Sequence, residues 1–285
     1  MSFTELLMSI EIGLIYGIVA IGIYLTFRII DFPDLTCDGS FVLGAVTSAV
    51  LIKNGHSPII SLLIASIAGG VAGFITGILH TKLRITNLLS GILVAFMLYS
   101  VNLRVMGGIP NIALINQTTI FNYIIINPLL LLIITTGIIW LLFGYLLITD
   151  FGLALYSIGQ NKRLAINVGI KTQQMIIIGL ILSNTLIAFG GALFSQHQDF
   201  ADVSQGVGTV IIGLAAVMIG ESILRFRSPW IIIASCILGS VVYRIFVAIA
   251  LHSDKLGLET QDLNIITGLL VIGVMLIPRR GSRAC

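Results

Sequence analysis

The sequence predicts an all-α integral membrane protein of about nine transmembrane helices, and two observations support this prediction. First, 57% of the 285 residues are hydrophobic and only 9% are charged, whereas a soluble domain carries about 25% charged residues. Second, the apolar segments are long and lack the period-two alternation of strands. Helices that satisfy their own backbone hydrogen bonds are therefore favoured over a closed barrel, and we expect a single transmembrane domain over residues 1–285.

Each predicted helix is an apolar run close to the roughly 20 residues that cross a bilayer. The predicted spans cover residues 7–28, 37–53, 58–79, 86–103, 126–148, 173–195, 208–224, 229–250 and 263–278. Two of them, 37–53 and 208–224, are short and contain glycine, so we expect broken or tilted helices there. The first 30 residues carry Glu5 and Glu11 in place of the basic region of a cleaved signal, and we expect them to be retained as the first span.

The Lys and Arg residues determine the predicted orientation, because cytoplasmic loops carry an excess of positive charge. With the N-terminus outside, 11 of the 15 Lys and Arg residues fall in inner loops and 3 in outer loops. The remaining one, Arg244, lies within a predicted span. We therefore predict an N-terminus outside the membrane and a C-terminus inside.

An acidic hexapeptide occurs twice, as DFPDLT at residues 31–36 and as DFADVS at residues 199–204. Other landmarks follow both copies in the same order, namely Gly39-Ser40 and Gly208-Thr209, Ser57-Pro58 and Ser228-Pro229, and NLLSGILV (87–94) and NIITGLLV (264–271). We predict one repeat over about 7–103 and a second over about 173–278, with the fifth span and an inner loop between them at about 126–172. The copies are displaced by five spans, an odd number, so the second runs upside down. Such inverted-topology repeats are the architecture of many transporters.

The acidic residues of both copies have two competing explanations. Asp34 and Thr36, or Asp202 and Ser204, can accept hydrogen bonds from the first free N–H groups of the helix that follows, and the acidic charge there suits the helix dipole. Alternatively, each acidic turn marks one mouth of a transport pathway. The candidate pathway and gate residues are Asp31, Asp34, Asp38, Asp199, Asp202, Tyr243 and Arg244.

Arg244 and its neighbour Tyr243 lie in the middle of a predicted span, where a charge costs at least about 2.5–3.5 kcal/mol. Such a residue normally faces the bundle interior or a wet cavity, so Arg244 is a candidate ligand for a substrate carboxylate. A structural pair with Glu221 or Asp38, or a snorkelling side chain, is the alternative. The four histidines lie near predicted span ends, where we expect solvated side chains.

The third predicted span carries a stripe of small residues at a spacing of four, Ala65, Gly69, Gly73 and Gly77. This spacing places them on one helical face and allows another helix to approach closely. We expect that helix to belong to the same subunit, in preference to a dimer seam.

The longest predicted inner loop is TDFGLALYSIGQNKRLAINVGIKT, residues 149–172. Apolar residues flank a polar turn at 159–163, so we predict two short surface helices joined by that turn. The loop resembles the cytoplasmic loop of the permease subunits of bacterial ATP-binding cassette (ABC) importers, in the branch of branched-chain amino acid and ribose permeases. The residues that carry the resemblance are Thr149, Gly152, Gly159, Asn161, Ala165, Gly169 and Ile170. The likeness extends to DFPDLTCDGSF, to GILHTKLRI with NLLSGIL, and to GTVIIGLAAVMIGESI, and so covers nearly the whole chain.

In that family the loop forms a coupling helix that docks into an ATPase subunit. The resemblance therefore implies coupling residues at Gly152, Leu153, Tyr156, Gly159, Gln160, Asn161, Lys162, Arg163, Ala165 and Gly169. It also implies two ATPase subunits, a second permease copy in a homodimer, a periplasmic or lipoprotein solute-binding protein, and the bacterial inner membrane. Within the family the chain most resembles a subgroup linked to uptake of aromatic amino acids such as tryptophan or tyrosine.

The chain contains no G-x-x-x-x-G-K-[ST] phosphate loop, so ATP and Mg²⁺ would bind to a partner subunit and we expect no enzyme activity here. Three cysteines without metal-site spacing predict neither a metal nor a cofactor in this chain, and we expect no nucleic-acid partner. An ion-coupled secondary transporter with inverted repeats is the main alternative, followed by an ABC permease for a branched-chain amino acid, sugar or nucleoside. An intramembrane enzyme is disfavoured because the HExxH and GxSxG motifs are missing.

Overall fold

The computed structural model describes residues 3–124, 126–224, 228–251, 265, 267–269 and 272–273. Its first half contains α1 (Phe3–Tyr24), the π-helical turn η1 (Leu25–Ile29), α2 (Thr36–Lys53), α3 (Pro58–Thr81) and α4 (Asn87–Val105). The middle contains β1 (Asn111–Ala113), α5 (Ile120–Tyr123), α6 (Pro128–Ile148), α7 (Asp150–Gln160) and α8 (Lys162–Asn167). The second half contains α9 (Thr172–Gln198), β2 (Phe200–Asp202), α10 (Thr209–Ile223) and α11 (Pro229–Leu251).

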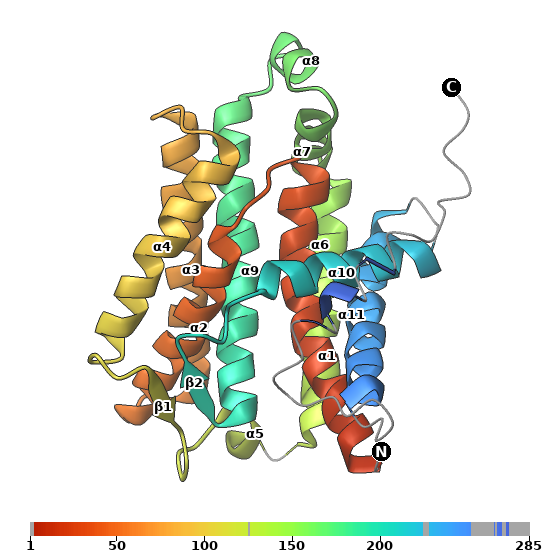
Figure 1. Cartoon of the computed structure of the whole chain (residues 1–285). Coiled ribbons are helices and arrows are strands. Elements are labelled where there is room, and N and C mark those ends of the chain that lie inside the picture. The colour runs from red at the N-terminus through yellow and green to blue at the C-terminus, as the bar shows by residue number, and fades with distance from the viewer. Residues whose placement is uncertain are drawn as a thin grey trace.

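The long helices run side by side, and each end of the bundle carries a distinct feature (Figure 1). The helices α7 and α8 project beyond one end, and we call them the arm and that end the arm end. The strands β1 and β2 lie at the opposite end, the sheet end, where α1 also begins. The described part of the chain therefore confirms the all-α membrane class, with one small sheet added.

Seven helices of the described residues are long and apolar enough to cross a membrane, and each corresponds to a predicted span. They are Phe3–Ile29, Thr36–Lys53, Pro58–Thr81, Asn87–Val105, Pro128–Ile148, Thr172–Gln198 and Pro229–Leu251. The span predicted at 208–224 needs correction, because α10 has only 15 residues and its length of about 22 Å falls short of a hydrocarbon core of about 30 Å. Figure 1 shows α10 lying across α1 near the middle of the bundle. The span predicted at 263–278 lies largely outside the described residues.

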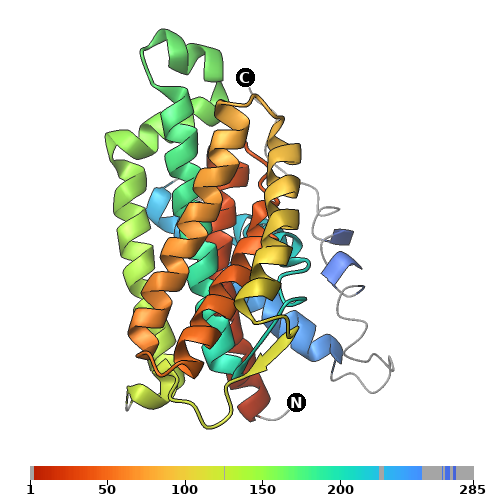
Figure 2. The ribbon, with the colours of Figure 1, turned by 90° about the vertical axis from the view of Figure 1, so that its left-hand side faces the viewer.

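The small-residue face of α3 packs against α9 within the same chain, which confirms the predicted intrasubunit contact. A Cβ added at Gly69 would lie 2.4 Å from the carbonyl oxygen of Asn184, and one at Gly73 would lie 2.3 Å from that of Leu180. Any larger side chain would push the two backbones apart, so glycine is required for this approach. Figure 2 shows α3 running beside α9 along the bundle.

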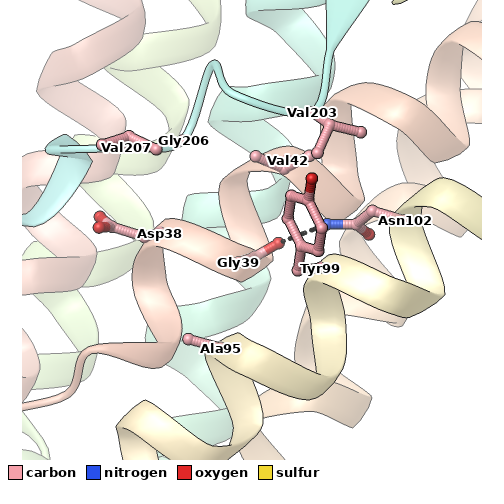
Figure 3. Close-up of a pocket in the computed structure, with 9 residues that line it drawn as sticks. All are labelled: Asp38, Gly39, Val42, Ala95, Tyr99, Asn102, Val203, Gly206 and Val207. Carbon is pink, nitrogen blue, oxygen red and sulfur yellow. Dashed lines mark hydrogen bonds between the residues drawn. The ribbon is translucent and has the colours of Figure 1, made fainter. Parts of the chain in front are cut away.

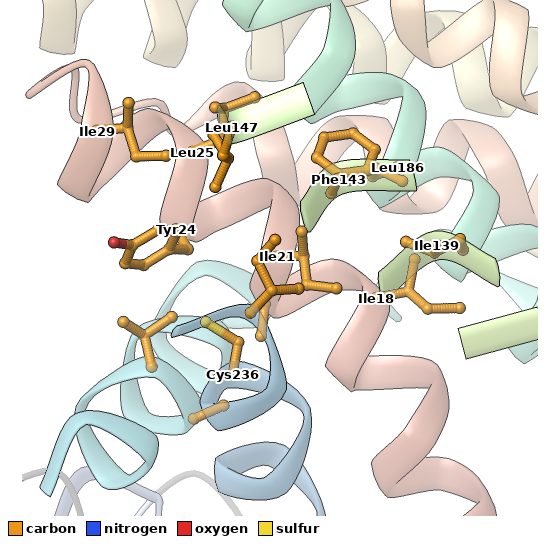
Figure 4. Packing of buried hydrophobic residues seen from close by; sticks show 14 of the residues in the cluster. Ile18, Ile21, Tyr24, Leu25, Ile29, Ile139, Phe143, Leu147, Leu186 and Cys236 are labelled. Carbon is orange, nitrogen blue, oxygen red and sulfur yellow. The ribbon is translucent and has the colours of Figure 1, made fainter. Parts of the chain in front are cut away.

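The largest cluster of buried apolar side chains joins α1 and η1 to α6 and α9 (Figure 4). Its labelled members include Ile18, Ile21, Leu25 and Ile29 on one side, and Ile139, Phe143, Leu147 and Leu186 on the other. Because α1 is apolar on all sides, it can be buried centrally instead of facing lipid along one stripe. The π-helical turn η1 is thereby held in the core, directly beneath the arm.

Strand pairing and a polar side-chain contact join separate segments of the chain at the sheet end. The strands β1 and β2 pair antiparallel, with Ile112 opposite Ala201. Close by, Nε2 of His197 lies 2.9 Å from Oε2 of Glu11, and both side chains are largely buried. The prediction of a solvated histidine at this span end is therefore wrong for His197, because a carboxylate on α1 supplies its polar partner inside the bundle.

Candidate functional site

The C-terminal part of α7 makes an unusually close backbone contact with the bundle. A Cβ added at Gly159 of α7 would lie 1.9 Å from the carbonyl oxygen of Ile29 in η1. The hydroxyl oxygens of Tyr156 on α7 and Tyr24 on α1 are 3.2 Å apart, and burial raises the pKa of Tyr156. Leu155 is fully buried beside this contact. The base of the arm is therefore packed directly onto the π-helical end of α1.

The two arm helices meet at a single residue, Asn161. Its side-chain oxygen accepts hydrogen bonds from the backbone N–H groups of Arg163 and Leu164, each at 3.1 Å, so Asn161 is the N-cap of α8. The helix ends before Gly169, whose φ of 90° favours glycine. The predicted pair of short helices is confirmed, with a turn narrower than the predicted 159–163.

The tip of the arm presents apolar side chains to its surroundings. Leu164 is 58% exposed, Ile166 54% and Val168 73%, and the neighbouring Lys162 and Arg163 are also exposed. Of the other predicted coupling residues, Leu153 and Gln160 are exposed, whereas Gly152 and Ala165 are buried. An exposed apolar patch on a projecting, basic segment is typical of a protein or membrane interaction site.

The first acidic turn caps α2 from inside the bundle. The Oδ1 atom of Asp34 accepts a hydrogen bond from the N–H of Thr36 at 2.9 Å, and Oδ2 accepts one from Nδ2 of Asn184 at 2.8 Å. Asp34 is fully buried. The predicted capping function of Asp34 is therefore present, and it also ties α2 to α9.

The cap of α10 comes from a different helix. The Oδ1 atom of Asp38 on α2 accepts a hydrogen bond from the N–H of Val210 at 2.9 Å, and Oδ2 accepts one from Gly208 at 3.4 Å. Asp202 was predicted to serve this purpose, but it accepts hydrogen bonds from the backbone N–H and the hydroxyl of Ser204. The predicted cap is wrong because α10 begins seven residues after Asp202, at Thr209.

Arg244 stacks on an aromatic ring instead of pairing with an acid. Its Cζ atom lies 4.4 Å from the ring centroid of Tyr16 on α1. The proposed partner Glu221 forms an ion pair with Arg28 of η1, and Asp38 caps α10. Among the described residues, no carboxylate lies within ion-pair distance of Arg244. The adjacent Tyr243 is buried against α10.

A small pocket of about 120 Å³ lies where α2, α4 and the segment before α10 meet. Its lining residues are Asp38, Gly39, Val42, Ala95, Tyr99, Asn102, Val203, Gly206 and Val207 (Figure 3). The Nδ2 atom of Asn102 donates to the carbonyl oxygen of Gly39 at 3.3 Å, and within the described residues its buried Oδ1 atom has no partner. Sequence reasoning singled out Asp38 but not Tyr99. For Asn102, the signal available in the sequence was a single amide side chain within an apolar predicted span.

The seven predicted pathway residues do not form one site. Asp31 lies at the arm end, where α1 ends, and Asp199 at the sheet end, where α9 ends (Figure 1). Asp34 and Asp38 are brought together at the start of α2, whereas Arg244 lies over Tyr16. The predicted coupling residues, in contrast, all lie in the arm or in the turn that follows it.

Comparisons with known proteins agree with the resemblance found in the arm sequence. The family described as "Branched-chain amino acid transport system / permease component" matches residues 6–278. The chain is 39% identical over 263 residues to a tyrosine transport system permease protein of Clostridioides difficile strain R20291, covering 92% of this chain and 88% of the relative. It is 27% identical over 285 residues to the autoinducer 2 import system permease protein LsrC of Yersinia pseudotuberculosis serotype O:1b, covering 98% of this chain and 77% of the relative.

A solved structure gives the same fold at low identity. PsaBC from Streptococcus pneumoniae, in complex with Fab, superposes with a TM-score of 0.57 at 12% identity and covers 96% of this chain and 91% of that one. This likeness supports the fold alone, whereas the family match extends over nearly all of the sequence. The chain is a multi-pass membrane protein and belongs to the family of branched-chain amino acid transport system permease components.

Proposed function

We propose that this chain is the translocation subunit of an ATP-driven importer for a small solute. An amino acid is the favoured solute, an aromatic one such as tyrosine or tryptophan before a branched-chain one. The structural observation that carries the proposal is the arm, which exposes Leu164, Ile166 and Val168 beside two basic residues. Family membership and the tyrosine transport relative support the solute class. ATP and Mg²⁺ would be bound by a separate ATPase subunit.

The contacts below the arm suggest how ATP binding would be transmitted. Movement of α7 would act on η1 through the close contact of Gly159 with Ile29. Arg28 of η1 is paired with Glu221 of α10, and Asp38 of α2 caps the other end of α10. Closure of the ATPase pair would favour one position of the arm. Through these contacts, that position would shift the equilibrium between the inward-open and outward-open states of the permease.

The remaining parts of the proposal concern assembly and the pathway. We propose a homodimer of permease copies with two ATPase subunits and an external solute-binding protein, in a bacterial inner membrane with the N-terminus outside.

The pocket between α2 and α4 is a candidate contact for the solute, because Tyr99 offers a ring and Asp38 a carboxylate there. These groups suit an aromatic amino acid, whose ammonium group and ring need such partners.

The proposal can be tested by reconstitution. The permease would be placed in liposomes with its ATPase and solute-binding protein, and ATP-dependent uptake of labelled L-tyrosine would be measured. Ile166→Glu at the arm tip should abolish uptake and ATPase association. Ile115→Glu, at the sheet end and also highly exposed (72%), is the matched control and should leave ATPase association unchanged. Unchanged uptake by Ile166→Glu would contradict the proposal, and competition by leucine, ribose or adenosine would reassign the solute class.

A second candidate, an ion-coupled secondary transporter, is favoured by one observation. Glu11 and His197 form a largely buried ionisable pair at the sheet end, and ionisable pairs inside membrane bundles often carry protons. Permease-only liposomes with an imposed proton gradient would test it. Uptake in the absence of any ATPase, lost in Glu11→Gln, would favour this candidate over the first.

A further inference from the structure

A second cavity lies at the arm end, between the arm and the bundle. Its volume is about 330 Å³, which falls within the range of small-molecule sites. Asp31, His80 and Asn87 contribute polar groups from the bundle, and Gln160 and Lys162 contribute them from the arm. The two walls therefore belong to different parts of the proposed transport machinery.

The polar groups of this cavity are available to a ligand. Among the described residues, the side chains of Asp31, Asn87, Gln160 and Lys162 make no hydrogen bond or ion pair. The backbone of Asp31 adopts a φ of 55°, an uncommon conformation for a residue other than glycine. One anionic group and one cationic group thus face the same space from opposite walls, without neutralising each other in an ion pair.

The apolar residues that line the cavity are all buried, namely Ile30, Phe32, Ile158 and Ile176. Phe32 is 1% exposed, and the ring of His80 packs edge-on against it at 5.1 Å between centroids. The Nδ1–H of His80 donates to the carbonyl oxygen of Ile85 at 2.8 Å, which assigns Nε2 of the neutral ring as an acceptor. The cavity therefore offers a ligand mainly polar groups, and an ammonium group can lie near both Asp31 and His80.

We propose that this cavity binds a free zwitterionic α-amino acid from the arm-end side. The carboxylate of the ligand pairs with Lys162 and the side-chain amides of Gln160 and Asn87, and its ammonium group pairs with Asp31 and His80. A bound molecule bridges the arm and the bundle and fixes their relative position. This consequence rests on the proposed function of the arm: accumulated solute on the arm-end side then slows the transport cycle, which is feedback by the product.

Binding is tested on the complete permease alone, in lipid nanodiscs of phosphatidylglycerol, by titration calorimetry. The probes are L-tyrosine, tyramine, which lacks the carboxylate, and 4-hydroxyphenylpropionate, which lacks the ammonium group. We expect only L-tyrosine to bind measurably. Asp31→Asn and Lys162→Gln should each weaken its binding by about tenfold or more, the effect of losing one charge-assisted contact.

Matched controls leave the cavity intact. Asp150→Asn, at the start of the arm, and Lys171→Gln, just after it, change exposed charges that do not line the cavity, and both variants should bind L-tyrosine like the wild type. Asn87→Trp fills the cavity with both charges retained and should also abolish binding. Wild-type affinity in Asp31→Asn and Asn87→Trp, or equal binding of tyramine, overturns the proposal.

A phosphatidylethanolamine headgroup carries the same pair of charges, an ammonium and an anionic group. The titration is therefore repeated in nanodiscs that contain this lipid. An unchanged affinity for L-tyrosine supports the free amino acid as the occupant. A loss of tenfold or more assigns the cavity to the lipid and overturns the proposal.

Feedback is measured separately, as the ratio of ATP-driven uptake into liposomes preloaded with L-tyrosine to uptake into empty ones. The ratio should be low for the wild type and close to one for Asn87→Trp. Because the binding titration needs no ATPase, it stands even if uptake proves to be ion-driven. Failure of the titration, conversely, leaves the importer function of the chain unaffected.

Discussion

Asp31 and Asp199, which open the two acidic hexapeptides, share the same left-handed backbone conformation, with φ of 55° and 56°. Asp31 follows α1 and η1 at the arm end, and Asp199 caps the end of α9 at the sheet end. Both side chains are exposed, and left-handed non-glycine residues are uncommon. Two such residues at matching sequence positions indicate that the likeness of the hexapeptides extends to their conformation.

The direction of the helices is consistent with the proposed inverted repeat. The helix α1 runs from the sheet end to the arm end, and α9 runs the opposite way (Figure 1). In each half, a left-handed Asp lies at or just after the end of a long helix, and a shorter helix, α2 or α10, follows. Discontinuous helices whose N-termini meet near the middle of the membrane are typical of transporter repeats.

Gly159→Ala should disturb the arm, because the new Cβ would lie 1.9 Å from the carbonyl oxygen of Ile29. Overpacking of this kind costs about 1–3 kcal/mol, so we expect a lower melting temperature and a large loss of ATP-dependent uptake. Gly137→Ala on α6 is the matched control, since a Cβ there meets nothing within 4 Å. That control should leave uptake intact and the protein at least as stable as the wild type. Equal uptake by both variants would show that the close contact is dispensable.

Asp38→Ala should destabilise the protein more than the loss of an ordinary helix cap. A cap is worth about 0.5–2 kcal/mol, and here the N–H groups of Gly208 and Val210 lose their side-chain acceptor at the start of α10. Ser57→Ala, which removes the exposed cap of α3, provides the comparison. Thermal unfolding in one detergent would measure both. A smaller effect for Asp38→Ala would mean that water replaces the carboxylate.

The stacking of Arg244 on Tyr16 predicts a graded response at residue 16. Tyr16→Phe keeps the ring face 4.4 Å from the guanidinium and should be nearly as stable as the wild type. Tyr16→Leu removes the cation–π contact together with the ring contacts to Phe41 and Phe194, and should cost at least about 2 kcal/mol, the value for a desolvated cation–π pair alone. Melting temperatures would check this order. If Arg244 instead binds a substrate carboxylate, Arg244→Gln will weaken solute binding while both Tyr16 variants retain it.

The acid sensitivity of the sheet end should depend on Asp202. Partial burial raises its pKa, but hydrogen bonds from Ser204 and Asn111 outweigh this effect and leave the pKa below its usual value. Asp202 therefore stabilises the folded state above its unfolded-state pKa of about 3.9, and this contribution disappears as the pH falls through the lower folded-state value. Asp202→Ala should lower stability at pH 7, and its difference from the wild type should shrink as the pH falls through the lowered pKa of Asp202. Hydrogen exchange of the β1 and β2 amides would measure the local stability of the sheet. Asn111→Leu should reduce the part of that stability that depends on pH.

Local patterns in the sequence predicted the helices well, because apolar length and turn chemistry depend on neighbouring residues. The helix α3 starts at the predicted Pro58, where Ser57 supplies the cap, and the arm forms its two predicted helices around Asn161. The contacts that define the candidate sites join distant segments instead. The pairing of Arg28 with Glu221, and of Glu11 with His197, could not be read from one segment of sequence.

The cap that Asp38 provides was also beyond local reasoning, because Gly208, which directly precedes α10, lies 170 residues later in the chain. The hexapeptide repeat even suggested the wrong acid, since Asp202 occupies the position equivalent to Asp34. A repeat in sequence therefore located the two turns correctly but did not identify which carboxylate serves the second helix.

The pairing of β1 with β2 constrains the order in which the chain is assembled during translation. Asn111 and Asp202, which face each other in this ladder, are 91 residues apart. The ribosome must therefore synthesise α6, the arm, α9 and β2 itself before β1 can pair. Until β2 has been synthesised, β1 is an unpaired edge strand, open to wrong pairing. The sheet is consequently a late step of biogenesis, and its closure marks the point at which the two halves of the chain have come together.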